Sequence, residues 1–277
     1  MTRSFDILGP EIPESPVVLS VPHGGREYPL ALRANLRVPT ELLASLEDRH
    51  VDTIALAARG CETLIVQRLG RAWIDLNRGE HERDPAVDDS AADRPPTAKV
   101  RGGLGIVPRR TGRTGELWRR RFSGAEIVAR IAADHRPYHA ALADLLERTR
   151  ARFGCAVLLD LHSMPPIAGS EARIVTGDRF GRSCATRFVR RAEMEAEAAG
   201  LRHIRNTPYA GGHILERHGN PAAQVHAIQL ELDRSLYLDR LLDQPGTGFD
   251  MTVALVRATI DALADEALAL PSALAAE

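Results

Sequence analysis

The sequence predicts an α/β fold: an open, mixed but mostly parallel sheet with helices on both faces. Short apolar or β-branched runs alternate along the chain with longer segments of helical spacing. Several runs are apolar at almost every position, as in strands covered on both faces. The chain has 277 residues with 44% hydrophobic content, which is enough for one substantial core. We therefore expect residues 1–277 to form a single domain.

The predicted strands share a mostly apolar run next to turn-forming or polar residues. They are Pro16–Val21, Thr63–Val66, Ala72–Leu76, Cys155–Leu161, Arg173–Thr176 and Val225–Leu232.

The predicted helices have apolar residues at intervals of three and four positions. They are Thr40–Arg59, Phe122–Phe153, Arg182–Ala199 and Phe249–Leu268. Thr40 is expected to cap the first of them. Pro137 is expected to kink or divide the second, because proline lacks the backbone N–H that a helix interior uses.

The stretch Gly79–Thr114 is the least regular part of the chain. It is rich in Asp, Arg, Pro and Gly and offers little material for a core. A long loop inside a compact domain is usually functional or disordered. We interpret it as an active-site loop.

Composition excludes several classes of partner. Lys plus Arg (36) and Asp plus Glu (37) nearly cancel, so no overall field favours nucleic acid or an anionic membrane. The three cysteines form no CxxC pair, which argues against a disulfide framework or a thiolate metal site. The N-terminus lacks the apolar core of a signal peptide, and no apolar run is long enough to span a bilayer. We expect a cytoplasmic globular protein.

Two predicted strands end in histidine. His23, followed by two glycines, comes after Pro16–Val21, and His162 ends the run that begins at Cys155. In open α/β sheets, ligands bind at the carboxyl ends of strands. A strand-capping hydrogen bond would explain either histidine alone, but the repetition favours a metal site with two histidine ligands. Strand alternation puts Asp160 on the same side as His162, where its carboxylate can orient the imidazole.

A hydrolytic zinc is usually held by three protein ligands, often two histidines and one carboxylate. Glu47 and Asp48 lie in the predicted helix Thr40–Arg59, where a charge on an inward face needs a partner. A solvated helix face would explain the same residues. The spacing does not choose between Glu47 and Asp48.

Asn77 and Arg78 follow the predicted strand Ala72–Leu76. An amide beside a planar fork of donors suits the binding of a carboxylate. A salt bridge from Arg78 to the acid-rich loop that follows is the alternative.

Near the end of Val225–Leu232, alternation places Gln229, Glu231 and Asp233 on one face. A carboxylate beside a zinc-bound water can act as general base and then pass the proton to the leaving amine. An edge strand with one solvated face would give the same pattern.

Two further segments carry histidines. Residues 206–220 combine a Gly-Gly turn with polar side chains and are interpreted as a binding loop; these are Tyr209, His213, Arg217 and His218. His135 and His139 lie in a predicted helix and are interpreted as surface or packing residues.

Together these motifs resemble the N-formylglutamate amidohydrolase family over residues 16–240. The motifs occur in the family's order: SVPHGG (20–25), EDRHVD (47–52), DLNR (75–78), GLGIVPR (103–109), RPYH (136–139), DLHSM (160–164), GDxxGxSC (177–184), PYAGGH (208–213) and QLEL (229–232). Each motif is short, but their shared order is specific.

The resemblance implies a fold similar to the zinc carboxypeptidases and succinylglutamate desuccinylases, with one zinc ion per chain. The ligands carried over from the family are His23, Asp48 and His162. Asp48 is chosen over Glu47 because the family motif carries Asp there. The carboxypeptidases place the acidic ligand three residues after the first histidine, where this chain has Arg26.

The resemblance also implies the roles of the remaining site residues. Asn77 and Arg78 would bind a substrate carboxylate, and Glu231 would be the general base. In addition, we expect the irregular loop to bind a second substrate carboxylate through Arg101 or Arg109, and we expect Tyr209 and His213 to contact the substrate.

One segment departs from the family's pattern. Members carry Thr-Arg-His-Tyr-Gly where this chain reads Leu-Glu-Arg-His-Gly at 215–219, so the arginine and histidine are shifted by one position.

The function implied is zinc-dependent hydrolysis of the amide bond in an N-acyl acidic amino acid such as N-formylglutamate. The alternatives are a carboxypeptidase-like or other N-acyl amino acid deacylase, and a non-catalytic protein that binds acidic metabolites. Zinc content separates the last alternative from the enzymes, since a binding protein needs no stoichiometric zinc.

Overall fold

The computed structural model describes residues 3–91, 95–111 and 115–269. Contacts along the chain divide it into two compact units. The first comprises Met1–Asp6, Pro22–Arg49 and Val66–Ala141, and the second comprises Ile7–Val21, His50–Ile65 and Leu142–Glu277. The single domain expected from the sequence stays a prediction.

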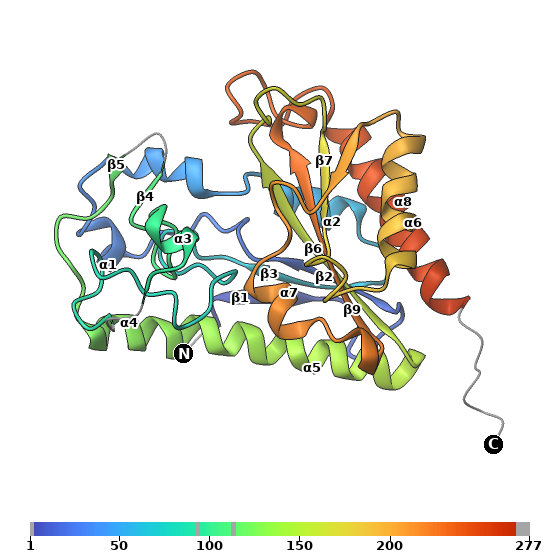
Figure 1. Ribbon diagram of the computed structural model, residues 1–277, viewed down its shortest axis with the longest axis horizontal. Coiled ribbons are helices and arrows are strands. Elements are labelled where there is room, and N and C mark those ends of the chain that lie inside the picture. Colours follow the sequence, from blue (N-terminus) through green and yellow to red (C-terminus); the bar gives the residue numbers. More distant parts are fainter. Residues whose placement is uncertain (1–2, 92–94, 112–114, 270–277) are drawn as a thin grey trace. The chain divides into compact units, whose positions relative to one another are not determined.

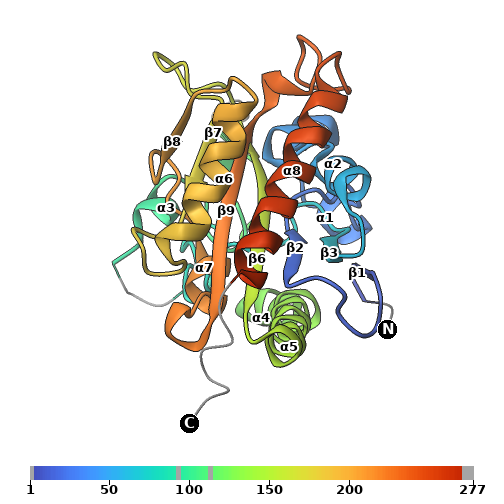
Figure 2. The same ribbon diagram turned by 90° about the vertical axis from the view of Figure 1, so that its right-hand side faces the viewer.

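A seven-stranded sheet runs in the order β1-β3-β2-β6-β9-β7-β8 (Figures 1 and 2). Its strands are β1 (Phe5–Leu8), β2 (Val17–Val21), β3 (Thr63–Gln67), β6 (Ala156–Met164), β7 (Ile174–Gly177), β8 (His203–Arg205) and β9 (Val225–Asp233). Strand β6 pairs in parallel with β2 and β9, whereas β7 runs antiparallel to β9. The predicted mixed, mostly parallel sheet is confirmed.

The central strands are covered on both faces. All residues of β2 and β6 are buried, which explains why their apolar runs show no alternation. Helices α6 (Thr186–Ala198) and α8 (Phe249–Leu268) lie side by side over one face, with α2 (Val51–Ala58) packed against α8 (Figure 2). Helix α7 (His213–His218) packs against β9 on the other face. The prediction of helices on both faces is confirmed.

Four of the six predicted strands occur within two residues of their predicted ends. The strand predicted at Cys155–Leu161 extends three residues further, to Met164, and so includes His162. Ala72–Leu76 is not a strand. The N–H of Trp73 donates to the carbonyl of Gly70, and the N–H of Asn77 donates to the side chain of Asp75 at 2.9 Å. A side chain that accepts from the backbone two residues on closes an Asx turn and bends the chain. The apolar pattern of this segment therefore reflects burial in a turn.

The predicted helix Thr40–Arg59 is also wrong as a single element. A 3₁₀ helix, η1 (Thr40–Leu46), ends at an extended Glu47, and α2 begins only at Val51. Thr40 makes no cap, because Pro39 occupies the N-cap position. Asp48 therefore lies between two helices, where its N–H donates to the carbonyl of His23 at 2.9 Å.

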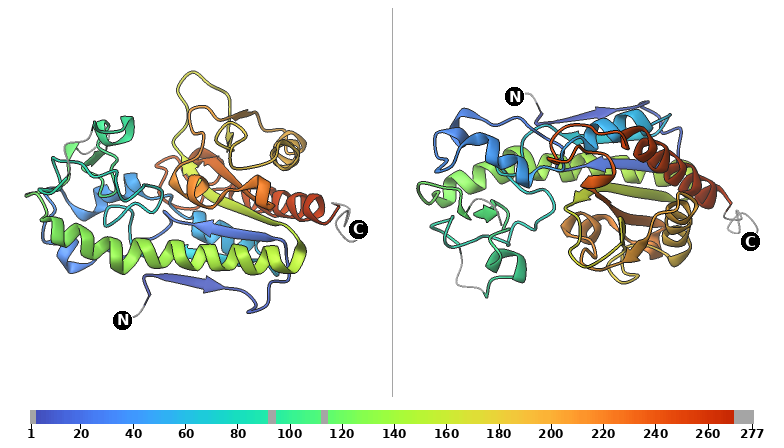
Figure 3. Two further views of the ribbon diagram at one scale, coloured as in Figure 1. Left: turned by 60° about the horizontal axis from the view of Figure 1, so that its bottom comes forward. Right: turned by 90° about the horizontal axis from the view of Figure 1, so that it is seen from above.

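Most of the segment Phe122–Phe153 is helical, as predicted, but it is not divided: a π-helical turn interrupts the α-helical bonding while the helix continues. It consists of α4 (Gly124–Arg130), a π-helical turn η2 (Ile131–His135) and α5 (Arg136–Phe153), which follow one another as one long rod (Figure 3). Pro137 stands at the second position of α5 and has no N–H to donate to the preceding turn. The wider π-helical bonding lies immediately before it.

The stretch Gly79–Thr114 is mostly irregular, as predicted, although residues 92–94 and 112–114 lie outside the described part. It contains α3 (Ala98–Arg101) and β4 (Arg110–Thr111), which pairs with β5 (Gly115–Glu116). The remaining short elements are α1 (Leu30–Arg33), η3 (Pro221–Ala223) and η4 (Arg234–Leu236).

Within the described ranges, no helix combines the length and apolarity needed to cross a bilayer. The cytoplasmic location stays a prediction.

Candidate active site

In the first unit, His23 lies between two carboxylates. It follows β2 by two residues and is 2% exposed. Its Nε2 lies 2.8 Å from Oδ1 of Asp75, and its Nδ1 lies 3.4 Å from Oδ2 of Asp48. An ionised carboxylate only accepts hydrogen bonds, so the imidazole donates from Nε2 to Asp75. Its Nδ1 faces a carboxylate oxygen of Asp48. A metal ion bound by an imidazole and a carboxylate would take these two atoms as ligands.

Asp75 is fully buried and remains ionised. Burial by itself raises the pKa of this carboxyl, but Arg71, Arg78 and His23 outweigh that effect and hold the pKa well below its ordinary value. The guanidinium of Arg71 lies 2.8 Å from Oδ2 of Asp75. The carboxylate is therefore fixed as an acceptor for the histidine.

The two acidic candidates have different neighbours. Glu47 accepts hydrogen bonds from the hydroxyl of Tyr28 and from Arg49, whereas Asp48 faces His23. Burial, and then the charge of Glu47, raise the pKa of Tyr28 well above its ordinary value, so this hydroxyl stays protonated and keeps donating. Neighbouring side chains in this extended segment point in different directions, which leaves Asp48 beside the histidine.

The second glycine after His23 has a packing role. A Cβ at Gly25 would lie 2.4 Å from the carbonyl oxygen of Leu69. The adjacent segments are joined by a hydrogen bond from the N–H of Glu27 to the carbonyl of Arg68. Gly25 is therefore required by the close approach of these two backbone segments.

Asn77 and Arg78 are both buried in the first unit. The guanidinium of Arg78 donates from Nε to the carbonyl of Leu104 at 2.8 Å and from Nη1 to the carbonyl of Asn77 at 2.6 Å. It lies 3.8 Å from Asp75, three residues earlier. Burial lowers the pKa of Arg78, and the charge of Asp75 opposes that effect. Arg78 is thus anchored to the irregular stretch at Leu104.

Arg109 is engaged with two carboxylates of its own unit. It donates to Asp84 at 2.8 Å and also to Glu116. The hydrogen bond with Asp84 raises the pKa of Arg109. Its predicted role in binding a second substrate carboxylate stays a prediction.

In the second unit, the pairing of β6 with β9 brings four polar residues together. The register sets His162 opposite Glu231 and Asp160 opposite Gln229. Nε2 of His162 lies 2.8 Å from Oδ2 of Asp160, the contact expected from strand alternation. Ser20 donates to the other oxygen of Asp160 at 2.6 Å, and Gln229 donates to Glu231 at 2.7 Å. These side chains are all buried.

Strand β9 lies between β6 and β7, so an edge strand with a solvated face is excluded. Asp233, two residues after Glu231, has a structural task. It is fully buried and accepts a hydrogen bond from Arg173 at 2.7 Å. It also accepts from the N–H and the hydroxyl of Ser235 and so caps the N-terminus of η4. Asp233 is therefore committed to holding the chain after β9.

The loop 206–220, predicted to bind a ligand, packs against the GDxxGxSC segment (177–184) of the same unit. The N–H of Arg179 donates to the carbonyl of Ala210 at 2.8 Å, and a Cβ at Gly177 would lie 2.8 Å from the Ala210 backbone. Tyr209 is half-buried, and His213 is the first residue of α7. Arg217 and His218 are the two residues shifted by one position relative to the family pattern. Arg217 is exposed, whereas His218 is buried, and burial lowers its pKa to about 3.

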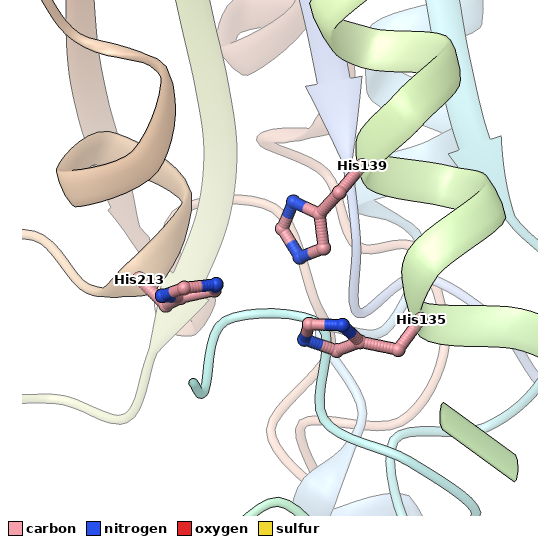
Figure 4. A group of neighbouring side chains, drawn as sticks. All are labelled: His135, His139 and His213. Carbon is pink, nitrogen blue, oxygen red and sulfur yellow. The ribbon is translucent and has the colours of Figure 1, made fainter. Parts of the chain in front are cut away.

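Sequence reasoning missed the contact of Asp75 with His23, and it left open whether His135 and His139 lie on the surface or in the packed interior. Both histidines are fully buried and project from one helix, one turn apart (Figure 4). Their Nε2 atoms lie within 2.9 Å of the backbone carbonyls of Arg78 and Leu76. The signal available for Asp75 was a charged residue inside an apolar run, which indicates a partner.

The described residues thus supply donor atoms of the kind that zinc binds: an imidazole and a carboxylate side by side at His23 and Asp48, and a second imidazole at His162 next to Glu231.

Comparison with known proteins gives consistent results. Residues 15–238 match the model of a family described as N-formylglutamate amidohydrolase. The chain is 32% identical over 236 residues to an N-formylglutamate deformylase of Pseudomonas putida, covering 81% of this chain and 82% of that protein. It is 30% identical to the N-formylglutamate deformylase of Pseudomonas aeruginosa over the same shares of both chains.

Among solved structures, the N-formylglutamate amidohydrolase of Ralstonia eutropha JMP134 superposes with a TM-score of 0.85 at 31% identity, covering 96% of this chain and 98% of that one. A protein of Agrobacterium tumefaciens shares the fold at 18% identity, with a TM-score of 0.69 and 96% of both chains covered. The chain therefore belongs to the N-formylglutamate amidohydrolase family and is an amidohydrolase that acts on a linear amide.

Proposed function

We propose that this protein hydrolyses the amide bond of an N-acyl acidic amino acid, with N-formylglutamate as substrate, and that it uses one zinc ion per chain. The products would be formate and glutamate. The names of the relatives support the substrate. The observation that carries the metal proposal is the pair of ligand atoms offered by His23 and Asp48, with Asp75 behind the imidazole.

The distance between these two atoms fits a shared zinc ion. Two ligand atoms about 2.1 Å from a tetrahedral zinc lie about 3.4 Å apart. Nδ1 of His23 and Oδ2 of Asp48 are separated by 3.4 Å. His23 and His162 are each held at Nε2 by a carboxylate, the arrangement that orients histidine ligands and raises their basicity.

His162 completes the proposed ligand set. Chain connectivity supports its inclusion. Ser20 on β2 pairs with Asp160 on β6, and His23 comes only three residues after Ser20 while His162 comes two after Asp160. Adjacent strands lie about 4.8 Å apart, so the covalent chain keeps the two histidines near each other.

Zinc bound there would polarise the amide carbonyl and lower the pKa of a water in its open position. Glu231, opposite His162 in the register, would take the proton from the attacking water and deliver it to the departing nitrogen. Gln229 donates to Oε1 of Glu231 and so holds the carboxylate in place.

Arg78 and Asn77 would bind the carboxylate of the substrate. A guanidinium offers five donors, and the bonds from Nε and Nη1 to backbone carbonyls orient it. Tyr209 and His213 on the loop of the second unit, and Arg109 of the first, are proposed to contact the remainder of the substrate.

Substitution of Arg78 tests the substrate class. Arg78→Lys keeps the charge but loses the planar fork, so KM for N-formylglutamate should rise, by about tenfold or more. Arg78→Ala should raise it further. Steady-state kinetics with N-formylglutamate and with a neutral N-formyl amino acid provide the comparison. Unchanged kinetics of Arg78→Ala on both substrates would rule out this role.

A further inference from the structure

The buried histidine pair His135 and His139 lies outside the chemistry assigned above. Both side chains are 0% exposed, and their rings are 4.4 Å apart between centroids. Nε2 of His135 lies 2.8 Å from the carbonyl oxygen of Arg78, and Nε2 of His139 lies 2.9 Å from that of Leu76. A carbonyl oxygen only accepts, so each imidazole carries a proton on Nε2 and donates it.

These two carbonyls flank Asn77. The histidines therefore hold the segment Leu76–Arg78 on both sides of the residue pair proposed to bind the substrate carboxylate. The segment belongs to no strand, so no ladder of backbone hydrogen bonds fixes it. The Asx turn at Asp75 anchors its beginning, and the two imidazoles anchor its end.

The helical segment that carries the histidines is packed in place and so fixes the positions of their side chains. His135 ends the π-helical turn η2, and His139 follows one turn later in α5. π-helical turns often occur at functional sites, where they alter the direction of side chains. Between the histidines, Tyr138 is fully buried with its ring edge-to-face against Phe5, at 5.5 Å between centroids.

We propose that His135 and His139 are positioning residues, which fix Asn77 and Arg78 for the substrate carboxylate by holding the carbonyls on either side of Asn77. This inference rests on the proposed function. Loss of either donor leaves a buried carbonyl without that hydrogen bond and loosens the segment. A small displacement of a positioning group is enough to weaken productive binding.

The test compares His139→Leu with His139→Gln, whose side-chain amide can place a donor where Nε2 stood. In His139→Leu, KM for N-formylglutamate should rise about tenfold while kcat changes by less than about threefold. Backbone amides in a peptide covering residues 74–80 should exchange with deuterium faster. Zinc content should be unchanged. His139→Gln should restore most of the KM and the protection. If His139→Leu does not fold, His139→Asn, which is polar but too short to reach the carbonyl, takes its place.

Several results would overturn the proposal. Unchanged exchange of residues 74–80 in the variant lacking the donor would show that the histidine does not hold the segment. The exchange could become faster in His139→Leu while its KM stays unchanged, although Arg78→Ala raises KM. That result would show that the histidine hydrogen bonds do not contribute to substrate binding. Loss of zinc would make the histidines metal ligands instead.

Failure of the proposed function gives a different result. If Arg78→Ala itself leaves KM unchanged, the carboxylate-binding role of Arg78 is wrong, and with it the positioning role. The exchange measurement needs no substrate and still decides whether the histidines hold the segment.

Discussion

Glu231→Gln is expected to lower kcat for N-formylglutamate by about two to four orders of magnitude, the usual contribution of general acid–base catalysis. The amide keeps the shape of the side chain and can still interact with Gln229, but it cannot take a proton from water. Zinc content should stay the same, because Glu231 is not proposed as a ligand. The measurement is turnover and metal content of the same purified sample.

Asp233→Asn is the matched control, since it makes the same chemical change two residues along β9. Asp233 holds Arg173 and caps η4, so this variant should lose stability but keep kcat close to the wild-type value. Normal turnover of Glu231→Gln together with inactive, folded Asp233→Asn would move the base to Asp233. Zinc loss in Glu231→Gln would make Glu231 a ligand.

His162→Ala is expected to lose most of the bound zinc and, with it, activity in proportion. Removal of one of three protein ligands leaves the metal with two, which is fewer than hydrolytic zinc sites use. His23→Ala should behave alike. Elemental analysis of protein purified without added metal gives the zinc content per chain.

His226→Gln is the control for a buried histidine of the same sheet. His226 lies on β9 packed against Phe188, and its Nδ1 accepts from the N–H of Ala185. This variant should keep its zinc. Full zinc retention in both His23→Ala and His162→Ala would exclude the proposed site.

The central strands of the sheet are predictable from sequence because most of their residues are apolar. In β2 and β6, burial on both faces requires apolar residues at successive positions, and that requirement is local. Ala72–Leu76 satisfies the same local pattern but forms a turn. The groups that decide its conformation are distant in sequence, since Asp75 bonds to His23 through its side chain and to Ile106 through its N–H.

In the candidate site, too, the features that depend on local sequence could be predicted, and those that depend on distant residues could not. Histidines close to the carboxyl ends of β2 and β6 were visible in the sequence, as was the alternation that pairs Asp160 with His162. The choice between Glu47 and Asp48 was not, because it depends on Tyr28 and His23, which come from elsewhere in the chain. The sequence could not place His135 and His139 on the surface or in the interior, because they bond to backbone carbonyls 57 and 63 residues away, which leave no trace in residue type.

Formate release from N-formylglutamate, measured on the wild-type protein before and after removal of its metal, tests the zinc-dependent hydrolysis most directly. Protein with about one zinc per chain should release formate and glutamate in equal amounts. The chelated protein should be inactive, and zinc should restore the rate in proportion to the ion bound. Full activity in metal-free protein would contradict the metal's role. One tightly bound zinc per chain without any formate release would contradict the substrate.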